Sequence, residues 1–383
     1  MIRVAEVLSD TNIGGAGRLL LTRFALSDKE QFDERIVLPS NSELCGEFLN
    51  LGYTPHEMNF CKDRSWDMSG VIPLYRYFSK TSPDIVNCHG CLSARIAAKL
   101  ARVPIRIYTR HCAFEPSTFM TGRCVRAINR VWSKSLSHKI IAVADAAKKN
   151  LTDIGIDEKI IEVIINGVEP IKKYSPEEKE LVRKEVGIPE NAFVCGMCAR
   201  LEDCKGIDVL LRAARKLLRS NTNYYFLIVG KGSQFFELKE LAYSLGISDK
   251  VKFVGFARDT TPYFNCFDLN LNCSRGTETS SLAISEGMSI GLPCVASSWG
   301  GNPHMVHDGY NGFIYPVDDF IRLAELVEVL YSDKFLYRQM SENSYKRYCE
   351  EFTAKRMTRL TEKLYMNLYL NHQDRRRAEA IAK

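Results

Sequence analysis

The sequence lacks the features that anchor a protein in a membrane or direct it out of the cell. No uninterrupted apolar run approaches the roughly 18 to 20 residues that a membrane-spanning helix requires. The start, MIRVAEVLSDTNIGGAG, has no charged n-region followed by a long apolar h-region, so we expect no signal peptide. Low-complexity segments and short-period repeats are also missing. These absences predict an ordinary globular protein of the cytoplasm.

Cysteine is abundant, but its pattern does not indicate a disulfide framework. The thirteen cysteines are odd in number and scattered through predicted strands and loops, which favours reduced, mostly buried thiols. Cys195 and Cys198 fall on one predicted strand, where their odd spacing sends the side chains to opposite faces. Cys88 and Cys91 leave a strand for a loop, and no second pair lies nearby to complete a zinc site. We therefore expect no metal at these thiols.

The length and the pattern of elements predict two α/β domains. A chain of 383 residues is too long for one compact core. Short apolar strands alternate with amphipathic helices in both halves, which is typical of doubly wound parallel sheets. We place one domain at residues 1–170, a charged linker at 171–190 and a second domain at 191–352. Residues 353–383 are expected to form a helix that crosses back to the first domain, with a frayed polar tail.

Ligands of doubly wound sheets bind at the carboxyl ends of the strands, so two such domains facing each other would form a cleft. At the first of these strand ends, residues 12–17 have the sequence NIGGAG and join a strand to a helix. Gly14 and Gly15 permit close approach of a ligand to the backbone, and a helix N-terminus attracts anions. A dinucleotide fingerprint, and hence a dehydrogenase, is the rival interpretation, but Leu20 stands where the third glycine belongs. A plain tight turn remains the other alternative.

Two further motifs are expected at the carboxyl ends of the strands in the second domain. Arg200 and Lys205 lie five positions apart in a strand-to-helix loop, where they could clamp neighbouring phosphates or simply be solvated charges. In SRGTETSSLAISEG, Glu278 and Glu286 lie on either side of a helix start near Leu282. The helix amides, behind an N-cap at Ser280 or Ser281, would face a phosphate. Alternatively, the glutamates are a dipole-favoured acid and an unrelated surface residue.

These motifs together carry a family resemblance. ARLEDCKG and SRGTETSSLAISEGMSIGLPCVASSWGGNPHMVHDGYNGFIYP resemble the nucleotide-binding half of the fourth family of retaining GT-B glycosyltransferases (glycosyl transferases group 1). In the first half, NIGGAG, PDIVNCHGCLSA, YTRHCAF, KIIAVADAAKKNL and IINGVE follow the order of that family. The resemblance spans about residues 4–317. It implies a GT-B fold of two Rossmann-like domains, the first on the acceptor side and the second binding a nucleotide-sugar.

The resemblance also implies roles for individual residues. Arg200 and Lys205 would neutralise the donor diphosphate, Glu278 would contact the transferred sugar, and His111 would lie beside that sugar from the opposite domain. Glu286 would bind the ribose, and Phe256 with the loop to Arg258 would hold the base. Gly14 and Gly15 would lie near the donor phosphates. The residues beside the transferred sugar would be Thr279, Ser280 and Ser281. The last three replace the Gly-aromatic-Gly run of the family, which leaves sugar preference open. His89 matches a family histidine less closely.

The predicted function is transfer of a sugar, with retention, from a nucleotide-diphosphate sugar, most simply a UDP-sugar. The acceptor would be a hydroxyl of a lipid-linked or polysaccharide substrate in cell-surface glycan synthesis. The chain has no Asp-x-Asp pair to hold a diphosphate through a cation, so we expect neither a metal nor a cofactor. A sugar-nucleotide epimerase of the same shape and a non-catalytic nucleotide-sugar-binding subunit are the alternatives.

The net charge of +6 is concentrated in residues 95–140, where Glu115 is the only acid. Arg123, Arg126, Arg130 and Lys134 recur at three-to-four spacing, which places them on one helical face beside apolar residues. This pattern predicts either a helix that docks peripherally on the anionic inner face of the cytoplasmic membrane or a solvated basic face over an apolar core stripe. No recognised nucleic-acid motif is present, so we expect no nucleic-acid partner.

Overall fold

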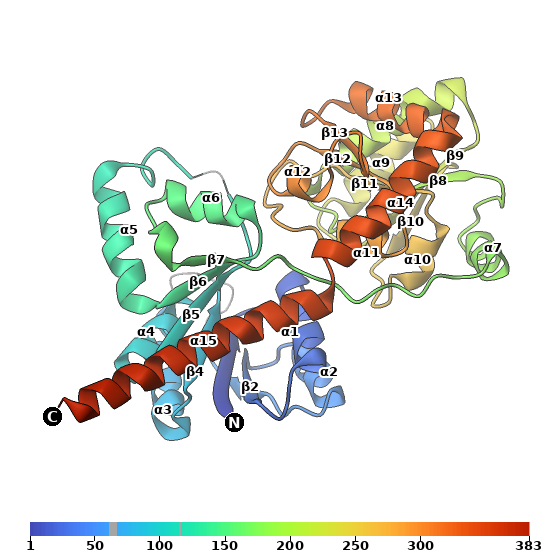
Figure 1. Ribbon diagram of the computed structural model, residues 1–383. Helices are drawn as coiled ribbons and strands as arrows, with labels where there is room; N and C mark the ends of the chain where they lie inside the picture. The colour runs from blue at the N-terminus through green and yellow to red at the C-terminus, as the bar shows by residue number, and fades with distance from the viewer. Residues whose placement is uncertain (61–66, 115, 383) are drawn as a thin grey trace. The chain divides into compact units, whose positions relative to one another are not determined.

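The protein is described by a computed structural model over residues 1–60, 67–114 and 116–382, so Glu115 lies outside the described residues. The chain divides into two compact units, the first formed by Met1–Gly167 with Ala354–Lys383 and the second by Val168–Thr353. Each unit is a parallel β-sheet with helices packed on it (Figure 1). The predicted fold class, two doubly wound α/β domains, is confirmed.

In the described part of the first unit, seven parallel strands pair in the order β3-β2-β1-β4-β5-β6-β7. The strands are β1 (Ile2–Leu8), β2 (Phe32–Pro39), β3 (His56–Met58), β4 (Ile85–His89), β5 (Ile105–Arg110), β6 (Lys139–Ala142) and β7 (Ile161–Val163). The helices are α1 (Gly15–Leu26), α2 (Leu44–Asn50), α3 (Val71–Thr81), α4 (Leu92–Leu100), α5 (Arg123–Leu136), α6 (Asp145–Asp153), η1 (Glu158–Ile160) and α15 (Ala354–Ile381). The central strands are buried along almost their whole length, because helices cover a doubly wound parallel sheet on both faces.

In the second unit, six parallel strands pair in the order β10-β9-β8-β11-β12-β13. The strands are β8 (Phe193–Cys198), β9 (Tyr224–Val229), β10 (Val251–Gly255), β11 (Leu269–Asn272), β12 (Cys294–Ser297) and β13 (Gly312–Tyr315). The helices are α7 (Pro176–Glu185), η2 (Asp203–Lys205), α8 (Ile207–Ser220), α9 (Phe235–Ser244), α10 (Thr261–Cys266), α11 (Leu282–Ser289), α12 (Asn302–Met305), α13 (Phe320–Ser332) and α14 (Lys334–Glu351). Its core lies between β8, β9 and β11 and the apolar faces of α8 and α13.

Residues 171–190, predicted from their charge density to be a linker, pack as part of the second unit. Val182 and Ile188 join an apolar cluster with Phe264. Arg183 donates hydrogen bonds to the carboxylate of Asp268, at 2.8 Å, and to main-chain carbonyls of the unit. Few apolar side chains make these contacts, so the charged composition of the segment does not reveal its packing.

The chain ends in the long helix α15, which belongs to the first unit and packs against α1 (Figure 1). Tyr365 is fully buried there, and the Glu362 carboxylate accepts a hydrogen bond from the backbone N–H of Asp28. The polar tail, expected to fray, is helical to Ile381. Its alanine, arginine, glutamate and glutamine residues are strong helix formers, which accounts for the difference.

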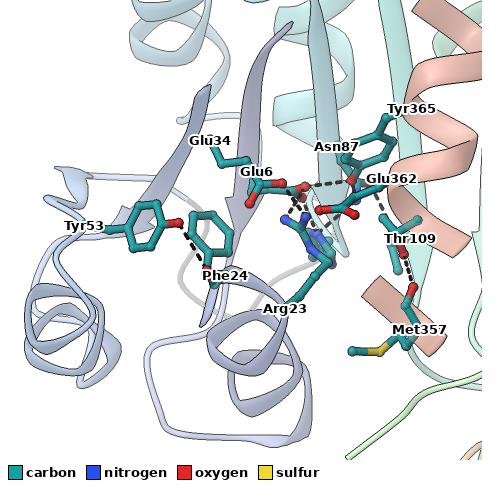
Figure 2. Close-up of polar contacts among 12 residues, drawn as sticks. Glu6, Arg23, Phe24, Glu34, Tyr53, Asn87, Thr109, Met357, Glu362 and Tyr365 are labelled. Carbon is teal, nitrogen blue, oxygen red and sulfur yellow. Dashed lines mark hydrogen bonds and ion pairs between the residues drawn. The ribbon is translucent and has the colours of Figure 1, made fainter. Parts of the chain in front are cut away.

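A cluster of three charges is buried inside the first unit. Arg23 of α1 lies between Glu6 of β1 and Glu34 of β2, with 2.7 Å between Arg23 Nη2 and Glu6 Oε1 and a second ion pair to Glu34 (Figure 2). All three side chains are almost fully buried. Burial lowers the pKa of Arg23, but the two carboxylates outweigh it and raise the pKa above its ordinary value. The guanidinium therefore stays charged, and it joins β1, β2 and α1.

We predict that the Arg23→Met variant loses about 3–5 kcal/mol of unfolding free energy, because it leaves two carboxylates buried without their cation. Urea denaturation followed by circular dichroism measures the loss. The matched control is Arg35→Met, which removes an exposed ion pair to Asp33 on the same sheet and should cost less than about 1 kcal/mol. Equal losses in the two variants would contradict the structural role assigned to Arg23.

Candidate functional site

The strand order of the second unit places the predicted Arg-Lys and Glu-Glu motifs at one edge of its sheet. Chain order reverses between β8 and β11, and ligands of doubly wound sheets bind outside the carboxyl ends of the strands at such a switch point. Arg200 and Lys205 follow β8, and Glu278 follows β11. Arg200 is exposed, whereas Lys205 ends the short helix η2 and is partly buried. The two motifs therefore flank the switch point from both sides.

Lys205 and Glu278 meet directly. The ammonium Nζ of Lys205 lies 2.7 Å from Oε2 of Glu278, and the Ser274 hydroxyl donates to the same oxygen at 2.9 Å. Their side chains are only 14% and 10% exposed. Two residues that the sequence analysis assigned to the same site, from separate motifs, thus form one ion pair. An ammonium has three N–H donors, so Lys205 can bind an anion while it remains paired with Glu278.

Glycines allow the loops at this edge of the second sheet to approach one another closely. Gly206 has a φ of +63°, and a Cβ on it would lie 2.2 Å from the carbonyl oxygen of Cys273. A Cβ on Gly300 or Gly301 would lie 2.1 or 1.5 Å from the carbonyl oxygens of Glu278 and Thr279, respectively. Only glycine fits these contacts, because any Cβ would overlap main-chain oxygen. No role was predicted for these glycines, although a Gly-Gly pair directly after a strand and bend is a recognisable marker of close backbone approach.

Helix α11 begins as the sequence predicted, with Ser281 as its N-cap. The Ser281 hydroxyl accepts a hydrogen bond from the N–H of Ile284 and another from the Asn272 side chain. The Ser280 hydroxyl is buried and has no hydrogen-bond partner among the described residues. Thr279 is buried just before the cap, and Glu286 is buried in the second turn of the helix. The helix therefore presents its N-terminal amides and one unsatisfied hydroxyl beside Glu278.

Phe256 follows β10 at the same edge. Its ring is half exposed, and the ammonium of Lys231, from the loop after β9, lies 4.8 Å from the ring centroid. An exposed aromatic face beside a cation can stack on a flat heterocyclic ligand. The structure thus places Phe256 on the same sheet edge as Lys205 and Glu278. Lys231 is a neighbour that the sequence analysis did not identify.

In the first unit, the glycine loop follows β1, next to β4 in the sheet. Gly14 caps α1 and Gly15 is its first residue, so the predicted strand–loop–helix arrangement is confirmed. Gly17 serves packing, because a Cβ on it would lie 2.7 Å from the Leu44 side chain. Gly14 and Gly15 thus begin α1 at the ligand-binding edge of this sheet, whereas the third glycine of the motif joins α1 to α2.

Two histidines meet at the same edge of the first unit. His89 ends β4 and His111 follows β5, and His89 Nδ1 lies 2.7 Å from His111 Nε2. His89 Nε2 lies 2.8 Å from Oε2 of the buried Glu6. Both histidines line a small cavity with Thr109, Asn166 and several apolar side chains. Burial, together with the neighbouring His89, lowers the pKa of His111 to about 3, so its imidazole is neutral at pH 7.

The cysteines do not contribute to either site. The cysteines that the structure describes are all free thiols, and burial raises the pKa of Cys88 to about 12. Cys195 is buried in β8, and Cys198 is partly buried at its end. In the described ranges, no group of three or more histidine, cysteine, aspartate or glutamate residues is arranged to hold a metal ion.

Three large apolar side chains of helix α5 are exposed. Ile128 and Val131 are 58% and 71% exposed, and Trp132 is 44% exposed. The basic residues of the same helix, Arg123, Arg126, Arg130 and Lys134, are also exposed. The alternative of an apolar stripe packed into the core is therefore wrong, because α5 buries only Ser133 and Leu136. Of the helices described, none is both long and apolar enough to span a membrane.

Comparison with known proteins gives consistent matches over both halves of the chain. Residues 13–171 match the family model Glycosyltransferase Family 4, and residues 178–347 match Glycosyl transferases group 1. An Escherichia coli relative, UDP-Gal:alpha-D-GlcNAc-diphosphoundecaprenol alpha-1,3-galactosyltransferase, is 26% identical over 97% of this chain and 98% of its own length. The Staphylococcus aureus capsular polysaccharide biosynthesis glycosyltransferase CapM is 24% identical over 80% of this chain and 83% of its own. A crystal structure of Anabaena Alr3699/HepE with UDP-glucose has the same fold, with a TM-score of 0.82, 21% identity, and coverage of 96% and 100% of the two chains.

The low pKa of His111 gives a prediction for stability against pH. Between its ordinary value of 6.5 and about 3, the unfolded chain binds a proton at this imidazole that the folded chain does not. Unfolding free energy should therefore fall as the pH is lowered through this range, with His111 contributing at most about 1.4 kcal/mol per pH unit. Urea titrations at pH 7, 6 and 5 measure the slope, which should be shallower in His111→Gln than in the wild type. A His111→Gln variant with the wild-type slope would show that His111 is not held neutral in the folded protein.

Proposed function

Because the chain belongs to the group 1 glycosyltransferases and has their GT-B fold, we propose that it moves a sugar from a UDP-sugar to a hydroxyl of a lipid-linked or polysaccharide acceptor in cell-surface glycan synthesis. The name of the E. coli relative gives that protein a UDP-galactose donor and a diphosphoundecaprenol-linked acceptor, and the S. aureus relative is named for capsule synthesis. The observation that carries the proposal is the Lys205–Glu278 pair beside the start of α11.

In this proposal, the residues at the edge of the second unit bind the donor. Lys205, held in place by Glu278, binds a diphosphate oxygen as a point charge, and exposed Arg200 adds a bidentate fork. The N-terminal amides of α11 and the unsatisfied hydroxyl of Ser280 bind the same group. Glu278 also contacts the transferred sugar, together with Thr279 and Ser281. The placement of these residues together on one unit supports donor binding there.

The proposed roles at the nucleoside end follow from shape and burial. Glu286, in the second turn of α11, binds two ribose hydroxyls through its two carboxylate oxygens. Phe256 stacks on the base with its exposed face. In the first unit, Gly14 and Gly15 approach the donor phosphates and acceptor, and neutral His111 contacts the transferred sugar.

We propose transfer with retention by front-face substitution. The bond from the anomeric carbon to the β-phosphate oxygen breaks while a bond to the acceptor oxygen forms on the same face, and the acceptor proton passes to the departing phosphate oxygen. Negative charge develops on the diphosphate, where Arg200, Lys205 and the α11 amides stabilise it. These groups supply the positive potential that a metal ion provides elsewhere, so the proposal includes no metal or cofactor.

The Lys205→Ala variant tests the donor site. We predict a loss of kcat/KM of about 10²- to 10³-fold, the range found when one charge-stabilising group is removed from a transition state. Release of free nucleotide diphosphate from a panel of UDP-sugars, with and without a polyprenyl-linked acceptor, measures the activity. Release that requires the acceptor also distinguishes transfer from epimerisation. Lys216→Ala, an exposed lysine of α8, is the control and should keep full activity. Unchanged turnover in Lys205→Ala would refute the assignment.

We also propose that helix α5 holds the protein peripherally on an anionic membrane, where a lipid-linked acceptor would be found. Exposed apolar side chains beside exposed arginines and lysines favour insertion among acidic lipid headgroups. The basic surface supplies attraction at long range, and Ile128, Val131 and Trp132 supply the apolar contact.

Vesicle flotation tests the membrane proposal. We predict binding to phosphatidylglycerol-containing vesicles that weakens as salt is raised, because the attraction between charges is screened. Val131→Glu should reduce this binding at least about tenfold, since it adds an acid and removes an apolar contact. Leu181→Glu changes an equally exposed apolar residue on α7 of the second unit and should bind as the wild type does. Binding that is insensitive to both salt and Val131→Glu would exclude α5 as the docking surface.

A further inference from the structure

Arg95, on helix α4, is a partly buried cation whose charge is not paired with an acid. Its Nε atom is buried, and in the described ranges Arg95 forms no hydrogen bond and no ion pair. Its guanidinium carbon lies 4.4 Å from the ring centroid of Tyr108, on β5. The neighbouring thiol of Cys88 is neutral at pH 7, because burial raises the pKa of this thiol to about 12. The protein therefore leaves the donors of Arg95 available.

Arg106 of the same unit shows how a partly buried arginine is satisfied when it serves the fold. Its side chain donates hydrogen bonds to the main-chain carbonyls of Val103, Ser135 and Leu136. Such bonds are expected, because a buried donor without a partner is unfavourable. Arg95 has the same burial without these partners. A buried polar group that the fold leaves unsatisfied is a candidate for contact with a ligand.

A second arginine contacts the same tyrosine. Arg110, the last residue of β5, donates from Nη1 to the Tyr108 hydroxyl at 3.2 Å. Its Nε donates to the carbonyl of Cys112 at 2.9 Å, and its Nη2 donates to Asn150 Oδ1 at 3.2 Å. A guanidinium has five N–H donors, so two remain after these three bonds. Burial lowers the pKa of Arg95, and the nearby positive charge of Arg110 lowers it further.

The two arginines lie at the carboxyl edge of the first sheet. Arg95 is the fourth residue of α4, which follows β4, and Arg110 ends β5. Ligands of doubly wound sheets bind at this edge. Helix α5 packs against α4, where Lys99 donates a hydrogen bond to the Ser135 hydroxyl (Figure 1). The pair therefore lies beside the helix that we propose to dock on the membrane, and Arg110 directly precedes His111 in the chain.

We propose that Arg95 and Arg110 bind the phosphate or diphosphate group of a lipid-linked acceptor. This inference rests on the proposed function, which supplies that acceptor. In a lipid-linked acceptor the phosphate joins the sugar to the lipid chain. The pair lies next to His111, the residue proposed to contact the transferred sugar, and beside the docking helix, where that junction belongs. Guanidinium groups bind phosphate oxygens through two parallel hydrogen bonds, and partial burial strengthens such bonds.

The headgroup of an acidic membrane lipid carries the same chemical group, but the position of Arg95 favours the acceptor. Arg95 is partly buried, whereas Arg123, Arg126 and Arg130 of α5 are exposed. A flat bilayer meets the exposed cations of α5 first. A recessed guanidinium is instead suited to one phosphate group that enters the edge of the sheet.

Calorimetric titration of the full chain with farnesyl diphosphate, at saturating UDP to occupy the proposed donor site, tests the inference. We expect the wild type to bind and Arg95→Met to bind at least about tenfold more weakly, since methionine keeps the contact with Tyr108 but removes the charged donors. The matched control is Arg76→Met, an exposed arginine of α3, which should bind as the wild type does. A wild type that does not bind farnesyl diphosphate would overturn the inference, even if Arg95→Met failed to fold.

Vesicle flotation distinguishes the two sources of phosphate. If the site holds the acceptor, Arg95→Met should float with phosphatidylglycerol-containing vesicles as the wild type does. Weaker flotation of Arg95→Met, together with unchanged binding of farnesyl diphosphate, would assign the site to a lipid headgroup and overturn the acceptor assignment.

Urea denaturation separates ligand binding from a structural role. Arg95→Met should keep the wild-type midpoint, because no hydrogen bond or ion pair of the described residues is lost. Arg106→Met should lower the midpoint, because it removes three side-chain hydrogen bonds to main-chain carbonyls. A lowered midpoint in Arg95→Met with unchanged binding of farnesyl diphosphate would show that Arg95 serves the fold alone.

The transfer assay shows whether the site acts in the proposed reaction. With a polyprenyl diphosphate-linked acceptor, Arg95→Met should raise the acceptor KM at least about tenfold and leave kcat within about twofold, as expected when binding is lost equally from the ground state and the transition state. An unchanged KM would overturn the inference and leave the proposed function standing. Binding of farnesyl diphosphate that needs Arg95, without transfer from any UDP-sugar, would keep this site and refute the proposed function.

Discussion

Parallel pairing of the strands is the constraint on which both candidate sites depend. Every strand pair described in the two sheets runs in the same direction, so each loop that follows a strand ends at the same edge of its sheet. At the switch point of the second unit, this places Lys205 and Glu278 in contact although 73 positions separate them in sequence. In the first unit, it places His89 and His111, from neighbouring strands, in contact.

The charges at these edges are held in different ways. Glu278 and Lys205 retain some exposure and are stabilised by each other and by Ser274. Glu6 and Arg23 are almost completely buried, and the desolvation of such a pair commonly cancels the attraction between its charges. An apolar pair of the same volume would serve the core equally well. A buried carboxylate at this position also lies 2.8 Å from His89 Nε2, a polar contact that an apolar side chain could not make.

Much of the fold follows from the sequence, because alternation of apolar strands and amphipathic helices dictates a parallel sheet. The N-cap at Ser281 and the strand-to-helix loops of Gly14 and Lys205 were also predictable, since each depends on local residue types. Glu6 was not, because a single acid in IRVAEVL looks like an outward-facing strand residue until its partners are known. Gly300 and Gly301 were missed for a similar reason, since their need for glycine comes from Glu278 and Thr279, more than twenty positions earlier.

The helix at the end of the chain completes the site at its beginning. Tyr365 of α15 holds one oxygen of Glu6, and Met357 and Thr361 of the same helix line the cavity beside His111. The first unit is therefore not a continuous segment of sequence, and residues 1–167 alone would leave Glu6 without one of its donors. The return of α15 therefore contributes to the polar contacts of Glu6 and to the cavity lined by His111, as well as to the packing of the unit.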